Sequence, residues 1–206
     1  MESENTAIQT HAGFAHPSPY PDIKVYGKNR NYAELLMDDY CGAAGEFTAA
    51  NQYKYHSLML KRVNVELAAM LSGIACVEAY HLELLAGAIQ SLGGNPVFRG
   101  GGSSVNFWSG DKLEYGKDIA GRLKSDLESE MNSIKNYREH IRKIQDPGIQ
   151  ALLRRIVLDE EVHERLIREA IEKYGALKEE AEKKEEVKAI KAPGRYVRRA
   201  MYSSRR

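Results

Sequence analysis

A stripe of apolar residues, interrupted by two polar ones, runs through residues 62–92 and limits the folds open to this chain. Its members follow one another at the three- and four-residue spacings of an α-helix: Leu67, Leu71, Ile74, Glu78, His81, Leu85, Ala88 and Leu92. Residues 148–174 repeat this plan, with Glu160 and His163 on the apolar stripe. The two stripes predict long helices that turn acids and histidines towards a core.

Four long segments carry helical periodicity, and no segment shows the alternation of a β-strand flanked by turns. They span residues 31–59, 62–92, 112–145 and 148–174. The glycine-rich stretch GGNPVFRGGGSSVNFWSGD separates the second segment from the third and is too long for a hairpin loop. We therefore expect an all-α fold, an up-down four-helix bundle with a long crossover between the second and third helices.

The two ends of the chain differ in character from the middle. Residues 1–30 hold three prolines and no helical period, so we expect an extended N-terminal arm that is not a packed element. A chain of 206 residues suffices for one domain with a sizeable core. We predict that the bundle spans residues 31–175, where the helical periodicity lies. Residues 176–206 read as a charged helical extension followed by a basic tail.

Composition argues against several classes of protein. A formal net charge of +1 gives no overall attraction to nucleic acid. The N-terminus lacks the pattern of a secretory signal, and the longest nearly apolar run, Leu67 to Val77, is too short to span a bilayer. The two cysteines form no CxxC pair, so we expect both to be small buried side chains. We expect a soluble, cytoplasmic protein with no membrane partner.

Four glutamates and two histidines on the stripes form a set suited to metal binding. Burying an ionised carboxylate without a partner is costly, and four such groups placed together repel one another. Two divalent ions would balance four carboxylates, with neutral imidazoles completing their coordination. The sequence therefore predicts two divalent metal ions per chain, held by Glu46, Glu78, His81, Glu130, Glu160 and His163.

Other polar residues near this set are expected to lie outside it. Glu161 and Glu164 point off the stripe and are expected either in solvent or beside the ligands, without binding metal themselves. His56 and His140 lie near predicted helix ends, where surface or capping positions are expected, and His16 belongs to the arm. None of these residues is a predicted ligand.

The segments around the six residues resemble those of a known family. The chain is similar to bacterioferritins, rubrerythrins and related ferritin-like proteins in AGEFTAANQYKYH (44–56), VEAYHLELLAGAIQSLGGNP (77–96), SEMNSIKNY (129–137) and LDEEVHERL (158–166). The resemblance covers roughly residues 31–174 and implies a ferritin-like bundle. It implies these roles: Glu46 and Glu130 as terminal ligands, Glu78 and Glu160 as bridges, His81 and His163 each on one metal, and Tyr53 as a candidate catalytic tyrosine beside them.

The resemblance also implies a di-metal oxidoreductase. Members of the family oxidise ferrous iron, reduce peroxide or, in the related manganese catalases, disproportionate it. Iron ranks first as the metal and manganese second. The chain lacks the CxxC pairs of a rubredoxin-like domain, so a peroxidase would need an external reductant. Ala79 stands where haem-binding bacterioferritins carry methionine, which predicts no haem.

The ends of the chain leave a second hypothesis open. A coat, shell or filament subunit could retain a ferritin-like bundle and assemble through residues 1–30 and 191–206. Ferritin-like chains commonly pair, so we expect a homo-oligomer, at least a dimer. For the basic tail, a disordered segment ranks first, docking on a subunit second and nucleic-acid binding last.

Overall fold

The computed structural model describes residues 13–100 and 106–191, with side chains described as far as residue 174. Its elements are, in order, the helices α2 (Arg30–Cys41), α3 (Glu46–Leu60) and α4 (Val65–Ser91), a 3-10 turn η1 (Gly110–Lys112), and the helices α5 (Ile119–Lys143) and α6 (Pro147–Lys191). No named strand occurs among the described residues. The prediction of an all-α bundle is confirmed.

The helix predicted over residues 31–59 is two helices, because a turn interrupts the helix between Cys41 and Glu46. Glycine has a low helix propensity, and two glycines, Gly42 and Gly45, bound the break. The amide of Gly45 donates to the carbonyl of Gly42 at 3.2 Å, which closes a turn in place of a helical hydrogen bond. The break makes Glu46 the first residue of α3.

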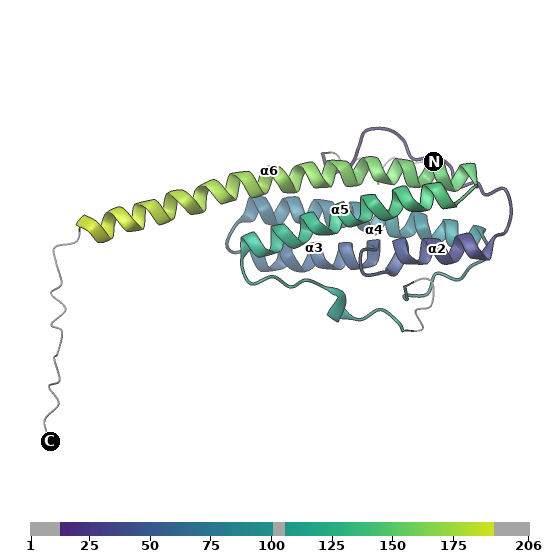
Figure 1. Ribbon diagram of the computed structural model, residues 1–206, viewed down its shortest axis with the longest axis horizontal. Coiled ribbons are helices and arrows are strands. Elements are labelled where there is room, and N and C mark those ends of the chain that lie inside the picture. The colour runs from purple at the N-terminus through teal and green to yellow at the C-terminus, as the bar shows by residue number, and fades with distance from the viewer. Residues whose placement is uncertain (1–12, 101–105, 192–206) are drawn as a thin grey trace, which may run out of the picture. The chain divides into compact units, whose positions relative to one another are not determined.

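The bundle is held together by an apolar core to which α2, α4, α5 and α6 all contribute. Figure 1 shows these helices side by side, and their buried side chains form one cluster that includes Leu36, Met37, Leu85, Ile89, Ile134, Leu153 and Ile156. Burial of each such side chain is worth about 1.5–3 kcal/mol. The core fixes the spacing of the helices and therefore the positions of the polar groups on their inner faces.

The predicted long crossover joins α4 to α5, and its described parts run along α3. Phe98 stacks on Phe47 at 4.4 Å, and Trp108 meets the same ring edge-on at 4.9 Å. Further along the crossover, the amide of Glu114 donates to Gln52 Oε1 at 2.9 Å. The described parts of the crossover therefore follow α3 from its start towards its end.

Residues 13–29, which we call the strap, pack against the bundle. This segment contains no helix. The amide of Tyr26 donates to Asp146 Oδ2 at 2.8 Å, and Arg155 Nε donates to the carbonyl of Ser18 at 2.7 Å. The expectation of an unpacked arm is therefore wrong for this part. The packing of the strap was not predicted because its hydrogen-bond partners lie more than a hundred residues away in the chain.

Helix α4 meets the length and composition test for a membrane-spanning segment. The core helix of a globular protein meets the same test, and 44% of the most apolar window of α4 is buried inside the bundle. Glu78 and His81 lie on its buried face. Cys76, expected to be buried, is exposed on this helix, whereas Cys41 of α2 is buried as expected.

The chain divides into two compact units, residues 1–171 and 172–206. In the second unit α6 continues to Lys191, so the predicted helical extension is helical over its described residues. The basic tail beyond residue 191 and the first twelve residues of the arm lie outside the described residues. The predicted domain boundaries at residues 30 and 175 stay predictions.

Candidate metal centre

The six predicted ligands lie together in the middle of the bundle, and all six are buried. They form two groups whose possible ligand atoms lie within 4.8 Å of one another. The first group, which we call the His81 half, consists of Glu46, Glu78, His81 and Glu160. The second, the His163 half, consists of Glu78, Glu130, Glu160 and His163. Glu78 and Glu160 belong to both halves, so the structure has two adjacent positions that could each hold a metal ion.

Helix geometry sets this arrangement, because residues three apart project from the same face. His81 Nδ1 lies 3.1 Å from Glu78 Oε2 on α4, and His163 Nδ1 lies 3.6 Å from Glu160 Oε2 on α6. Each histidine also faces the partner helix, with His163 Nδ1 2.9 Å from Glu78 Oε1. Both Glu-x-x-His elements therefore point at the same small volume.

Several buried atoms in this volume lack a hydrogen-bond partner among the described residues. Glu78 Oε1, Glu160 Oε1 and His163 Nδ1 lie within 3.1 Å of an oppositely charged group, but not in hydrogen-bond geometry. His163 Nε2 has no hydrogen-bond partner at all among the described residues. Buried polar atoms are normally satisfied, since leaving one unpaired costs about 1–3 kcal/mol. Carboxylate oxygens and the Nδ1 atoms of two imidazoles that converge on one point are the donor set of a divalent transition metal, so these residues fit such an ion.

The charges in the cluster shift the pKa values of its members in opposite directions. Burial, followed by the charges of Glu78 and Glu160, raises the pKa of Glu46 well above its ordinary value. Burial acts in the same sense on Glu78, but the charges of His163 and His81, both in close contact with its carboxylate, outweigh burial and lower its pKa. Burial opposes protonation of His163, whereas Glu78 and Glu160 raise its pKa to about 9. In the metal-free cluster, bound protons therefore neutralise part of the negative charge of the carboxylates.

Two tyrosines hold the two glutamates that belong to one half only. Tyr53 of α3 donates to Glu130 Oε1 at 2.6 Å, and Tyr137 of α5 donates to Glu46 Oε1. Burial raises the pKa of both phenols well above the ordinary value, so both remain donors. The predicted position of Tyr53 beside the cluster is therefore found, and Tyr137 occupies the equivalent place on the other side.

A second network, not predicted from the sequence, supports His81. Asp159 Oδ2 lies 2.9 Å from His81 Nε2, so this carboxylate can hold the outer nitrogen while Nδ1 faces the cluster. Arg155 Nη1 lies 2.7 Å from Asp159 Oδ2, and the hydroxyl of Tyr20 donates to the same oxygen at 2.5 Å. Asp159 directly precedes the predicted ligand Glu160, and this adjacency was the only sequence signal that could have pointed to Asp159. Tyr20 had none, because it comes from the strap.

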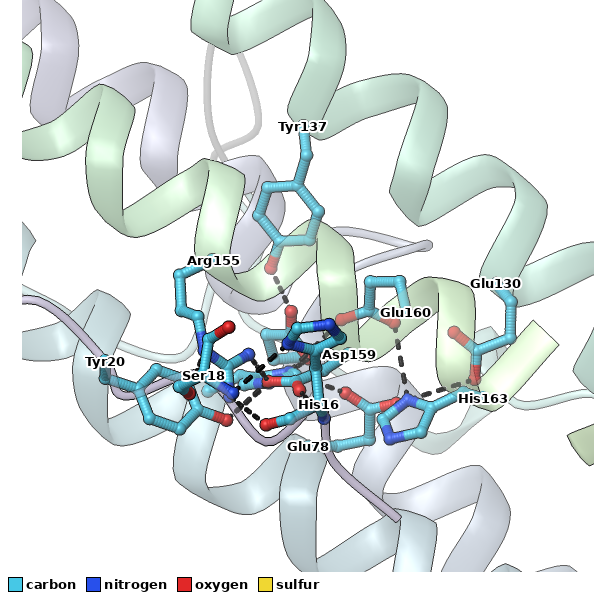
Figure 2. Close-up of polar contacts among 12 residues, drawn as sticks. His16, Ser18, Tyr20, Glu78, Glu130, Tyr137, Arg155, Asp159, Glu160 and His163 are labelled. Atoms are coloured by element: carbon cyan, nitrogen blue, oxygen red, sulfur yellow. Dashed lines mark hydrogen bonds and ion pairs between the residues drawn. The ribbon is translucent and has the colours of Figure 1, made fainter. Parts of the chain in front are cut away.

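Figure 2 shows where this support lies. The strap residues gather beside Asp159 and Arg155, while Glu130 and His163 lie on the other side of the cluster. His163 Nε2 has no hydrogen-bond partner among the described residues. The two halves therefore share bridging carboxylates but differ in what holds their histidines.

Two further histidines were expected at surface or capping positions, but both are buried. His56 Nδ1 lies 2.8 Å from Asp126 Oδ1, and His140 Nδ1 lies 2.7 Å from Asp39 Oδ2, with all four residues buried. Each histidine follows its glutamate, Glu46 or Glu130, by ten positions, which was a usable signal. By contrast, Glu161 is exposed and bonded to an arginine of α5, as expected for a residue off the stripe.

Comparison with known proteins agrees with this geometry. The family model of the ferritin-like domain matches residues 43–176. A protein of Clostridium acetobutylicum named probable manganese catalase is 29% identical over 202 residues, covering 85% of this chain and 88% of the relative. Two crystal structures of KatB, a manganese catalase from Anabaena, match with a TM-score of 0.70 and 25% identity, covering 78% of this chain and 80% of KatB.

These matches confirm the resemblance inferred from the sequence and the ferritin-like character of the bundle. The family match spans all of α3, α4 and α5, and the part of α6 that carries Glu160 and His163. It therefore includes all six residues of the cluster. The chain belongs to the ferritin-like domain family.

Proposed function

We propose that this protein is a di-metal oxidoreductase of the manganese catalase type, which converts two molecules of hydrogen peroxide into two of water and one of O₂. The observation that carries the proposal is the pair of overlapping ligand groups that share Glu78 and Glu160 and contain buried polar atoms without a hydrogen bond. The named relatives of this chain support manganese ahead of iron, which reverses the order of the initial expectation.

The roles of the six residues follow from their places in the two groups. Glu78 and Glu160 belong to both halves and would bridge two ions, while Glu46 and Glu130 would each bind one. His81 and His163 would contribute one nitrogen each through Nδ1, the atom that faces the carboxylates. Two ions held in this way supply the two-electron redox couple that peroxide disproportionation needs.

The remaining residues of the centre fix these groups in place. The phenols of Tyr53 and Tyr137 donate to Glu130 and Glu46 and so restrict the rotation of carboxylates that would bind one ion each. Asp159 holds the ring of His81 with Nδ1 directed at the carboxylates. Buried apolar side chains flank the cluster along α4, with Ile74 before Glu78 and Leu85 after His81, and limit access of water to it.

The first test is metal content. The purified protein is expected to hold two manganese ions per chain when it is produced in manganese-containing medium, as measured by elemental analysis. The double variant Glu130→Ala with His163→Ala is expected to lose metal, since it removes two ligands of the His163 half. Glu161→Ala with Glu164→Ala is the matched control, because both glutamates lie off the cluster. Unchanged metal content in the first double variant would show that the ligand assignment is wrong.

The second test separates the reactions. Oxygen release from peroxide by the manganese-loaded protein, without added reductant, is the expected result. Consumption of O₂ during oxidation of Fe(II) would identify a ferroxidase instead. Peroxide loss only with an added electron donor would identify a peroxidase. A protein that binds no metal and shows none of these reactions would favour the hypothesis of a coat, shell or filament subunit.

A further inference from the structure

The strap reaches the candidate metal centre through one side chain. The hydroxyl of Tyr20 donates to Asp159 Oδ2 at 2.5 Å and lies 3.4 Å from His81 Nε2. The guanidinium of Arg155 lies over the phenol ring, 3.9 Å from its centre, and the ring of Tyr80 meets it edge-on at 5.0 Å. Tyr20 is thus held on three sides beside the outer nitrogen of His81.

The backbone of the strap is fastened to the same two residues. Asp159 Oδ1 accepts the amide of His16 at 2.6 Å, and Arg155 donates to the carbonyls of His16 and Ser18 at 2.7 Å each. Asp159 and Arg155 are both buried. The contacts that place Asp159 against His81 therefore also bind three residues of the strap.

Glycines on the bundle make room for the strap. A Cβ at Gly73 of α4 would overlap the ring of Phe14, and one at Gly148 of α6 would overlap the carbonyl oxygen of Lys24. Glycine inside a helix costs about 1 kcal/mol relative to alanine, so a mid-helix position such as Gly73 calls for a reason. The seat of the strap supplies one, which indicates that the docked position is built into the bundle.

We propose that Tyr20 is a positioning residue. When the strap is docked, Tyr20 holds Asp159 against His81 and covers this side of the cluster. The metal ion of the His81 half is therefore released more slowly than the metal ion of the His163 half. The inference rests on the proposed function, because it concerns metal held by the six ligands. The unsupported outer nitrogen of His163 is the internal comparison. Partners outside the ligands typically change metal affinity by about 10–100-fold.

The sharpest test removes one oxygen atom. Tyr20→Phe keeps the ring under Arg155 and deletes the hydroxyl bonded to Asp159. With manganese-loaded protein and excess chelator, the wild type is expected to release its two ions in two phases. Tyr20→Phe is expected to accelerate the slow phase about 10-fold. Tyr26→Phe is the matched control, because this strap tyrosine is 82% exposed and should release metal at the wild-type rates.

A second pair of variants displaces the whole strap without touching the cluster. Gly73→Leu fills the space taken by Phe14, and Gly148→Ala meets the carbonyl of Lys24. Both are expected to speed tryptic cleavage after Lys24 and to accelerate the slow phase of metal release. Gly27→Ala, on the strap itself, has no atom within 4 Å of the new Cβ and serves as the control. Circular dichroism checks that each variant retains its helices.

The outcomes separate this proposal from the one on which it rests. Wild-type protein without bound manganese would overturn the proposed function. Metal-loaded Tyr20→Phe that releases both ions at wild-type rates would overturn the role of Tyr20 alone. A strap that is cleaved faster in Gly73→Leu, with no change in metal release, would contradict the covering role. Unfolding of the metal-free proteins in urea, measured alongside, distinguishes loss of positioning from general loss of stability.

Discussion

Tyr53 and Glu130 are joined by a hydrogen bond of 2.6 Å that crosses from α3 to α5, and Tyr137 returns the same contact from α5 to Glu46 of α3. Each tyrosine follows the glutamate of its own helix by seven positions but bonds to the glutamate of the other helix. The two contacts lock a pair of helices that lie far apart in the sequence and orient one carboxylate in each half of the cluster.

Removal of either phenol hydroxyl should therefore weaken both folding and metal binding. Tyr53→Phe leaves Glu130 without its donor, and we expect a loss of about 1–2 kcal/mol in the free energy of unfolding of the metal-free protein. Metal affinity should fall by about 10-fold. Urea unfolding and a manganese titration measure the two effects. Tyr55→Phe, on the same helix but outside the cluster, should change neither. A Tyr53→Phe protein with wild-type affinity would show that the hydrogen bond does not position the ligand.

The metal-free cluster should be a source of instability that metal relieves. Burial and the neighbouring glutamates raise the pKa of Glu46, so replacement by a neutral isostere removes an unfavourable charge. We expect Glu46→Gln to stabilise the metal-free protein by about 1 kcal/mol. The same variant should lose much of the stabilisation by manganese, which for the wild type is about 2.7 kcal/mol at a concentration of 100 times Kd.

Thermal unfolding with a chelator and with manganese measures both parts of this prediction. Glu161→Gln is the control, because Glu161 is exposed and lies off the cluster. Equal stabilisation of Glu46→Gln and wild type by manganese would remove Glu46 from the ligand set.

The buried pair His140 and Asp39 should make stability depend on pH. Burial opposes protonation of His140, but the hydrogen bond to Asp39 and its charge outweigh burial and raise the pKa of the imidazole. Burial likewise raises the pKa of Asp39. The folded state then binds more protons than the unfolded state, so the pair stabilises the fold below the unfolded histidine pKa of about 6.5, and this contribution is lost as pH rises through the folded pKa.

A double variant isolates this effect. Asp39→Asn with His140→Gln keeps polar groups at both positions but removes both titrations. Its free energy of unfolding, measured in urea with a chelator present, should fall less than that of the wild type as the pH is raised from below to above about 6.5. Parallel pH profiles for the two proteins would show that the pair does not hold a proton.

The break between α2 and α3 should resist substitution. A Cβ at Gly45 would lie 2.5 Å from the carbonyl oxygen of Asp38 and 2.7 Å from that of Asp39, closer than backbone atoms tolerate. We expect Gly45→Ala to destabilise the protein by about 1–3 kcal/mol and to lower its manganese content, since Glu46 follows directly. Denaturant unfolding and elemental analysis check both effects. Wild-type values in Gly45→Ala would mean that the break does not set the position of Glu46.

Much of the fold could be predicted from the sequence because it depends on local periodicity. Glu78 and His81 interrupt an apolar stripe at helical spacing, and so do Glu160 and His163, which was enough to place both pairs on inner helix faces. The helix predicted over residues 31–59 was drawn too long, because its apolar pattern continues across Gly42 and Gly45. At these glycines a turn is favoured over a helix, and the spacing of apolar residues does not show where such a turn occurs.

The supporting residues were harder to predict because their partners are distant in the chain. His56 and His140 read as surface residues near helix ends, yet each is buried against an aspartate that another helix supplies. Tyr20 has no periodic signal at all. Its contact with Asp159 spans 139 positions and exists only when the strap is docked.

The sequence by itself determined the helical stripes of α4, α5 and α6, the long crossover, and the six acids and histidines that must face one another. Helix spacing and the cost of buried charge can both be inferred from residue order. The tertiary structure alone decided which groups orient those six. It joined Tyr53 to Glu130, turned His81 towards Asp159 and laid the strap across that side of the cluster. The reason is physical: hydrogen bonds between distant segments depend on how the helices pack, and helix packing brings together residues that no local pattern connects.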